Sequence, residues 1–390
     1  MTRTFWLALL IGIHLAIASP ALAQGTVNDV IGFLVTNQAV PTGDFQKDQT
    51  AAEAARAAIA NALLIDLTSV PLATASSGFL YRFNPGLGTV ERATDSFGGF
   101  FVERALTPGP GHASFGVSTT TSAFDQFDGR NLHDGALVTV ANQFRDESAP
   151  FDTESLILHI RSSTMTMFGS VGIGNRIEIG AALPLVRLTL DGQRVNVYRG
   201  ATLVQATANA TASGMADLAI RGKINLVASP SGGAAIAGEV RLPTGDASNL
   251  LGTGTTSFRI MGIGSLEHGP VALHGNASML RGGVSSEYDF GGALSLAVDP
   301  RVTLSGETLV RRVTELHALD LIAAPHPTLV GVNTFRLAPG VDPETLAVMV
   351  TGVKWNVART VVIGGHLNWS LTHRGLTAPL TPTLAFEYAF

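Results

Sequence analysis

From residue 112 to residue 390, apolar residues recur at every second position, and no other feature restricts the fold of this chain as strongly. The period is clearest in the stretches 177–185, 218–226 and 302–310. Successive side chains of a β-strand point to opposite faces, so each stretch predicts a strand with one apolar face and one small or charged face. We expect about twelve such strands, within a range of roughly ten to fourteen. Their length of about nine to fifteen residues is near or above that of a tilted membrane-crossing strand.

The composition shows that alternation, rather than a long helix, must carry the apolar residues. The chain has 390 residues, of which 46% are hydrophobic and 14% charged, and a mean hydropathy of +0.29. After the first two dozen residues, no run of about 18 apolar residues could cross a bilayer as a helix. Disordered chains have fewer apolar and more charged residues, and 43 Gly exclude a coiled coil. The absence of Cys excludes disulfide-stapled and thiolate-metal proteins, and a net charge of −5 gives no basic surface for nucleic acid.

The first 23 residues have the order of a secretory signal peptide. Arg3 precedes an apolar run over residues 5–18, and residues 21–23 (ALA) supply a small-x-small cleavage site. A retained membrane anchor is the alternative, which the short apolar run disfavours. We therefore expect an exported protein that is cleaved after Ala23 and, having no Cys, carries no lipid at its N-terminus.

The residues before the alternating region have a different character. The Ala-rich stretch 48–67 predicts one helix, with Asp48 available as its N-cap. Residues 77–106 are dense in Phe, Arg and Glu without a clean period. We predict three parts: a signal peptide at 1–23, an N-terminal periplasmic or plug segment at 24–111, and a β-barrel at 112–390. The sequence leaves open whether the middle part enters the barrel.

The connections between the predicted strands alternate between short and long. Short turns are expected at 172–175, 228–233, 267–270, 299–300 and 356–358. Longer loops are expected at 123–153, 191–213, 244–255, 312–344 and 371–381, with a shorter one at 281–286. An even strand count puts both ends of the chain on the short-turn side, which is typical of outer-membrane barrels. Such a sheet must close, because each unpaired backbone group in lipid costs several kcal/mol.

The last strand and two motifs resemble known outer-membrane proteins. The alternation over 384–390 ends at Phe390 and resembles the C-terminal signal read by the barrel-assembly machinery. Residues 95–98 (DSFG) with 103–106 (ERAL), and 241–246 (RLPTGD) with 249–254 (NLLGTG), resemble the transporter family named for a phenol meta-pathway degradation cluster. That family is distantly similar to long-chain fatty acid and toluene channels. The resemblance implies passive passage of small, often hydrophobic or aromatic, compounds across the outer membrane of a Gram-negative-type bacterium.

The charged and His residues on the polar strand faces are the candidate lining of the lumen. By strand parity they are Arg161, Glu178, Arg221, Lys223, Glu239, Arg241, Arg259, His274, Arg301, Glu307 and His366. One interpretation is that they pair only to fill and stiffen a narrow barrel; the other is that they define a polar path or hold a plug. The Phe-rich segment before the first strand supplies the plug candidates Glu91, Arg92, Asp95, Phe97, Phe100, Phe101, Glu103 and Arg104.

The sequence gives weaker support for an enzyme than for a channel. His274, Asn276 and Ser278 share a strand face, as in a Ser-His-Asn phospholipase, but they face the lumen, whereas a lipid-cleaving site should face the membrane. No H-E-x-x-H motif is present, and the acidic loop 125–134 lacks calcium-loop spacing. We therefore expect a channel with no catalytic residue, cofactor or metal, whose partners are outer-membrane lipid, the assembly machinery and a small-molecule substrate. The alternative is a non-conducting structural or adhesion barrel that acts through its long extracellular loops.

Overall fold

A computed structural model describes residues 25–36, 38–68, 81–84, 89–92, 96–229, 231–358 and 360–390, with backbone only for 81–84 and 89–92. The predicted signal peptide and Asp95 lie outside these residues. No helix in the described ranges is long and apolar enough to cross a membrane.

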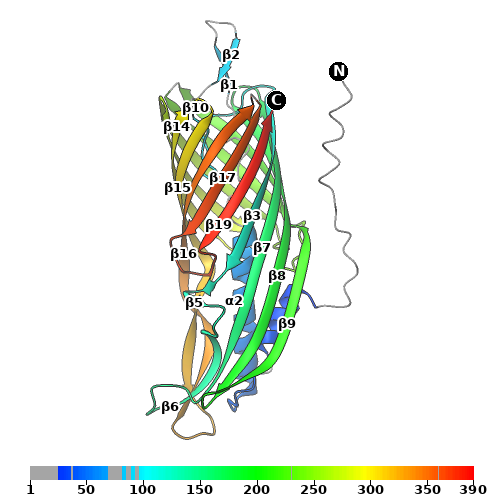
Figure 1. Cartoon of the computed structure of the whole chain (residues 1–390), viewed down its shortest axis with the longest axis vertical. Coiled ribbons are helices and arrows are strands. Elements are labelled where there is room, and N and C mark those ends of the chain that lie inside the picture. The colour runs from blue at the N-terminus through cyan, green and yellow to red at the C-terminus, as the bar shows by residue number, and fades with distance from the viewer. Residues whose placement is uncertain are drawn as a thin grey trace.

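Twelve antiparallel strands form a closed barrel, as the alternation predicts (Figure 1). Around the barrel they are β3 (Ala113–Phe124), β7 (Asp152–Ile173), β8 (Ile177–Tyr198), β10 (Leu218–Ser229), β11 (Gly232–Leu242), β12 (Ser257–His268), β13 (Val271–Gly282), β14 (Glu287–Asp299), β15 (Val302–Pro325), β16 (Val332–Ala358), β17 (Val361–Ser370) and β19 (Leu380–Ala389). The barrel closes because β19 pairs with β3 from Ala389↔Ser114 to Thr383↔Thr120. Closure leaves no sheet edge in the lipid.

The two ends of the barrel differ in the length of their connections. Ala113 and Phe390 are hydrogen-bonded to each other (2.9 Å in both directions), so the first and last strands meet at the end that carries the short turns. In outer-membrane barrels the end with the chain termini and the short turns is periplasmic. By that convention we name this end of the barrel periplasmic and the opposite end extracellular. At the short-turn end, Figure 1 places the hairpin of β1 (Tyr81–Asn84) and β2 (Thr89–Arg92) beyond the barrel rim.

At the extracellular end, some strands continue past the barrel and form a second structure, which we call the extension. It consists of β6 (Leu137–Phe144), β9 (Ala201–Met215) and the distal residues of β7 (152–161), β8 (186–198), β15 (313–325) and β16 (332–346). The strands of the extension are hydrogen-bonded in the order β9–β8–β7–β6–β16–β15. They form a curved, open sheet that continues beyond the ends of the shorter strands β10 to β14. Three two-residue strands, β4 (Gln126–Phe127), β5 (Arg130–Asn131) and β18 (Leu376–Thr377), form a separate small sheet.

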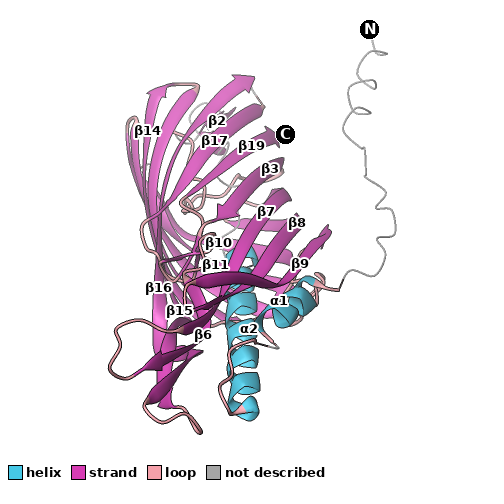
Figure 2. Ribbon diagram, turned by 60° about the horizontal axis from the view of Figure 1, so that its bottom comes forward, coloured by secondary structure: helices cyan, strands magenta, loops and turns pink. Residues whose placement is uncertain are grey.

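Two helices occupy the concave side of the extension (Figure 2). The shorter, α1 (Val27–Val35), contacts β8 and β9, and the longer, α2 (Phe45–Thr68), contacts β15 and β16. Their apolar residues, such as Leu34 and Leu63, share one buried core with Leu188 of β8. Because helices and strands both contribute side chains to this core, the extension is packed like a soluble domain.

The helix starts follow local capping chemistry. In α1, Thr26 and Asp29 form a capping box, which the sequence analysis did not identify. The helix predicted at 48–67 corresponds to α2, which begins three residues earlier, and the second helix, α1, was not predicted. Asp44 and not Asp48 caps α2, because an Asp44 carboxylate oxygen accepts from the backbone N–H of Lys47 (3.2 Å).

Candidate functional site

The residues 96–107, which we call the lumen segment, lie among the inward-facing side chains of the periplasmic half of the barrel. The Glu307 carboxylate of β15 accepts the backbone N–H groups of Phe100, Phe101 (3.0 Å) and Val102 (2.8 Å). Lys354 of β16 donates from Nζ to the carbonyl oxygens of residues 98 (2.8 Å) and 99. The segment has no regular secondary structure, so its buried backbone groups need partners from the barrel wall.

The opposite wall binds the second part of the lumen segment. Arg221 of β10 is ion-paired with Glu103, and Asn225 donates to the carbonyl oxygen of Ala105 (2.8 Å). Lys223 donates to the carbonyl oxygen of residue 104 (3.3 Å) and forms an ion pair with Glu178 (2.7 Å). The lumen segment is therefore tied to both sides of the barrel.

The two glycines of the lumen segment allow this close approach. A Cβ atom on Gly99 would lie 2.8 Å from Oε1 of Glu307, and one on Gly98 would lie 2.7 Å from Nε of Arg104. The next residue, Phe100, packs against His366 with ring centroids 4.3 Å apart. A larger residue at 98 or 99 would push the segment off its anchors.

A ladder of paired charges lines the wall beside the lumen segment. The pairs are Arg241–Glu239 (2.7 Å), Arg259–Asp289 (3.3 Å) and Arg311–Glu287 (2.9 Å). All six side chains are at least nine-tenths buried, and buried charges persist in proteins when they are paired. The first pair lies within β11, whereas the other two link β14 to β12 and to β15.

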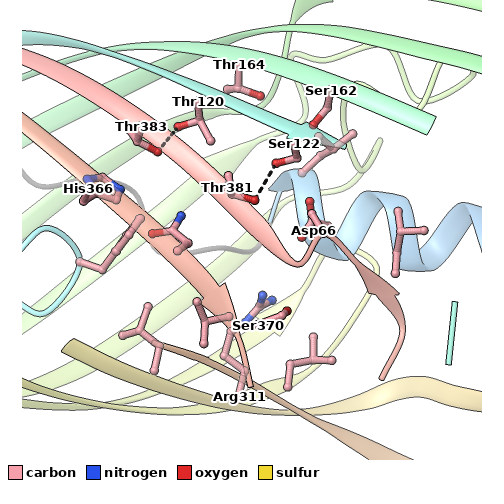
Figure 3. A pocket seen from close by; sticks show the side chains of 18 of the residues that line it. Asp66, Thr120, Ser122, Ser162, Thr164, Arg311, His366, Ser370, Thr381 and Thr383 are labelled. Atoms are coloured by element: carbon pink, nitrogen blue, oxygen red, sulfur yellow. Dashed lines mark hydrogen bonds between the residues drawn. The ribbon is translucent and has the colours of Figure 1, made fainter. Parts of the chain in front are cut away.

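A chamber of about 200 Å³ lies between α2 and the lumen segment (Figure 3). One wall carries hydroxyl groups, contributed by Ser118, Thr120, Ser122, Ser162, Thr164, Thr166, Thr381 and Thr383 of β3, β7 and β19. Other lining residues are apolar and include Leu309, Leu346 and Val348 of β15 and β16. Asp66 and Leu67 at the end of α2 line it, as does Phe101 of the lumen segment, and His366, Asn368 and Arg311 add polar groups. The chamber thus combines a hydroxyl-lined wall with an apolar one.

Most of the predicted lumen residues are buried, but two differ from the prediction. Glu178, Lys223, Arg241, Arg259, His274, Glu307 and His366 are buried, and Arg221 and Glu239 are partly buried. Arg161 is exposed, because it pairs in register with Thr189 in the extension, where the outer face is polar. Arg301 is exposed in the turn before β15.

Among the plug candidates, Phe97, Phe100, Glu103 and Arg104 are buried and Phe101 is partly buried. Glu91 and Arg92 belong to β2, for which only the backbone is described. Lys354 was not among the predicted lumen residues, although its position between Val353 and Trp355 makes it inward-facing by strand parity. The pattern of the sequence also gave no indication of Asp66.

His274, the strand-face residue weighed for hydrolysis, bonds through Nδ1 to Oγ of Ser265 on β12 (3.0 Å), and Ser278 donates to Asp289 (2.8 Å). These contacts bind His274 and Ser278 to different partners rather than to each other. Within the described part of the chain, no three His, Asp or Glu residues are grouped so as to hold a metal ion.

Comparison with known proteins gives distant similarity to solved structures at low sequence identity. No known protein family and no curated protein matches the chain. Among solved structures, an outer membrane channel from Pseudomonas putida F1 is similar (12% identity, TM-score 0.46, 73% of this chain and 98% of that one). The P. putida toluene transporter TodX (8%, 0.35, 72% and 91%) and the translocator domain of the autotransporter NalP from Neisseria meningitidis (11%, 0.37, 72% and 89%) are more distant. The resemblance to the phenol-pathway family stays a prediction.

Proposed function

We propose that this protein is an outer-membrane channel for the passive uptake of small hydrophobic or aromatic molecules, closed by its own N-terminal residues. One observation carries the proposal: a chamber in the lumen bounded by the end of α2 on one side and by Phe101 of the lumen segment on the other. A barrel that served only as a rigid support would need no such space, since interiors are otherwise filled to close packing.

The chamber supports a small substrate with an apolar body and few polar groups. Its volume of about 200 Å³ exceeds the roughly 150 Å³ of an engineered protein cavity that binds benzene. The hydroxyl wall of β3, β7 and β19 offers donors and acceptors, while Leu309, Leu346 and Val348 offer apolar contact. Ligand sites commonly combine an apolar lining with a few polar groups that fix orientation.

Passage requires the lumen segment to move, and Glu307 is its main anchor. One carboxylate holds three consecutive N–H groups, and hydrogen bonds to a charged group are worth about 1.5–3 kcal/mol each. Loss of this carboxylate should release residues 100–102 without touching the other wall. We therefore expect Glu307→Ala to open the channel more often.

The test is single-channel recording of the full-length protein in planar bilayers, with Glu287→Ala as the matched control. Glu287 is also a buried lumen carboxylate of the ion-pair ladder, but it bonds to Ser285 and Arg311 rather than to the lumen segment. We expect higher conductance or open probability for Glu307→Ala than for the wild-type chain and for Glu287→Ala. Equal conductance of the three proteins, each shown to be folded by its heat-modifiable migration, would refute gating by the lumen segment.

The non-conducting barrel remains the second candidate because the extension has a compact apolar core of its own. That arrangement would suit a barrel whose extracellular part carries the function. It predicts no measurable conductance from the wild-type chain, from Glu307→Ala or from a folded barrel that lacks residues 25–107.

A further inference from the structure

The N-terminal helix α1 lies at the extracellular end of the barrel. Val27 donates its backbone N–H to Oδ1 of Asn249 (3.3 Å), and Asn28 donates to the carbonyl oxygen of Ser248 (3.4 Å). Both partners belong to the loop 243–256 between β11 and β12, which lies opposite the short turns. The apolar face of α1 packs on β8 and β9 within the extension.

The linker between α1 and α2 is held at the same end by a buried ion pair. Glu154 of β7 and Arg194 of β8 lie 3.1 Å apart and are almost fully buried. The Glu154 carboxylate accepts from the backbone N–H of Ala39, and the Arg194 guanidinium donates to the carbonyl oxygens of Phe33 (3.2 Å) and Thr36. These contacts are hydrogen bonds from a buried ion pair to individual backbone atoms, like the bonds that hold the lumen segment in the barrel. The two helices and their linker are therefore a structural part of the extension.

Residues further along the chain lie on the other side of the lumen. The lumen segment occupies the periplasmic half of the barrel, and β1 and β2 lie beyond the periplasmic rim (Figure 1). With the barrel oriented in this way, α1 and α2 are extracellular and β1 is periplasmic. The end of α2 and Phe101 of the lumen segment both line the chamber inside the closed ring of twelve strands, so the described residues from the two sides of the barrel meet within one lumen.

We propose that the barrel carries its own N-terminal segment to the cell surface, so that the mature N-terminus, α1 and α2 are displayed outside the cell. A chain exported to the periplasm can reach this arrangement only if residues 25–68 cross the outer membrane through, or during closure of, the barrel that follows them. The apolar core and the Glu154–Arg194 clamp then retain the segment outside. Self-export is thus a second activity of the barrel, separate from uptake of small molecules.

The absence of Cys from the whole chain makes site-specific labelling direct. Gln46→Cys and Glu53→Cys place a thiol on the exposed side of α2, at two positions so that a local defect in one cannot decide the result. Val330→Cys, which is fully exposed in the loop between β15 and β16, reports the extracellular side, and Ser231→Cys reports the short-turn side. A membrane-impermeant maleimide is added to intact cells and, in parallel, to cells with a permeabilised outer membrane.

We expect Gln46→Cys and Glu53→Cys to react in intact cells as strongly as Val330→Cys, and Ser231→Cys to react only after permeabilisation. Labelling of both α2 variants only after permeabilisation, with Val330→Cys reactive in intact cells, would overturn the proposal. So would labelling of Val330→Cys only after permeabilisation, because the extension would then be periplasmic. Maleimide labelling does not depend on conduction by the barrel. A result that overturns surface display of the helices can therefore be distinguished from a result that overturns the channel function.

Discussion

The barrel and the extension share strands but reverse the chemistry of the two strand faces. On β8, the outward residues Ile177 and Ile179 are apolar and the inward Glu178 is charged. Ten residues later on the same strand, the outward Arg187 and Thr189 are polar and the inward residues 186, 188 and 190 are buried Val and Leu. The parity is unchanged while the polarity inverts, which marks the level at which the surroundings change from lipid to water.

The inversion means that the two regions are stabilised by different contributions. In the barrel, the apolar face contacts lipid and the interior is held by ion pairs and by the lumen segment. In the extension, burial of Leu and Val against α1 and α2 supplies the hydrophobic contribution, as in a soluble domain. The same kind of substitution should therefore be costly in one region and almost without effect in the other.

The largest effect is expected from the core of the extension. Leu63 of α2 is completely buried, and truncation of a buried Leu to Ala costs about 2–5 kcal/mol. We expect Leu63→Ala to make the extension sensitive to added protease while the barrel keeps its heat-modifiable migration. Leu294→Ala, at a lipid-facing position that is half exposed, is the control and should leave protease resistance unchanged. If Leu63→Ala abolished both the protease resistance of the extension and the heat-modifiable migration of the barrel, the two regions would not unfold separately.

A pair of substitutions on β8 tests the level of the inversion directly. Arg on a lipid-facing position costs about 2–4 kcal/mol near the bilayer midplane and less toward the interface, whereas surface substitutions in water stay within about 0.5 kcal/mol. We expect Ile179→Arg to lower the free energy of unfolding in lipid vesicles and Thr189→Arg to have almost no effect. Equal costs at the two outward positions would mean that both face the same solvent.

A smaller effect concerns the pH dependence of the clamp that holds the helices. Burial raises the pKa of Glu154 above its ordinary value of 4.5, despite the hydrogen bond from Ala39 and the Arg194 charge. The folded extension then binds more protons than the unfolded one, so this group makes the extension less stable as pH rises from the ordinary Glu range. We expect the protease resistance of the extension to fall less steeply with rising pH in Glu154→Gln than in the wild-type chain. Glu53→Gln, on the exposed side of α2, serves as the control, and equal pH trends in both variants would contradict the assignment.

The sequence predicted the barrel well because alternation is imposed by lipid on every strand in it. It predicted the extension poorly for a related reason. The stretches 123–153, 191–213 and 312–344 were expected to be loops, but they contain β6, β9 and the distal ends of β15 and β16. β9 has the sequence ATLVQATANATASGM, which lacks a strongly apolar face; the residues that it adds to the core shared with α1 include Ala210 and Ala212, whose side chains are small.

The site was predictable by residue type but not by position along the lumen. Parity identified Glu307 and Lys223 as inward-facing, and composition identified the lumen segment as unusual. Their partners are backbone N–H and carbonyl groups, which no side-chain pattern can reveal. The error at Arg161 arose because parity alone does not distinguish an outward face in water from an inward face in a lumen.

In the proposed topology, the N-terminal segment is a thread through the closed ring of barrel strands. A folded block lies on each side of the ring: α1 and α2 at one end, and the hairpin of β1 and β2 at the other. Withdrawal of the thread would require one block to unfold or the ring to open. The lifetime of the assembled protein is therefore set by an unfolding rate rather than by a binding equilibrium, a mechanical interlock that persists even where individual contacts are weak.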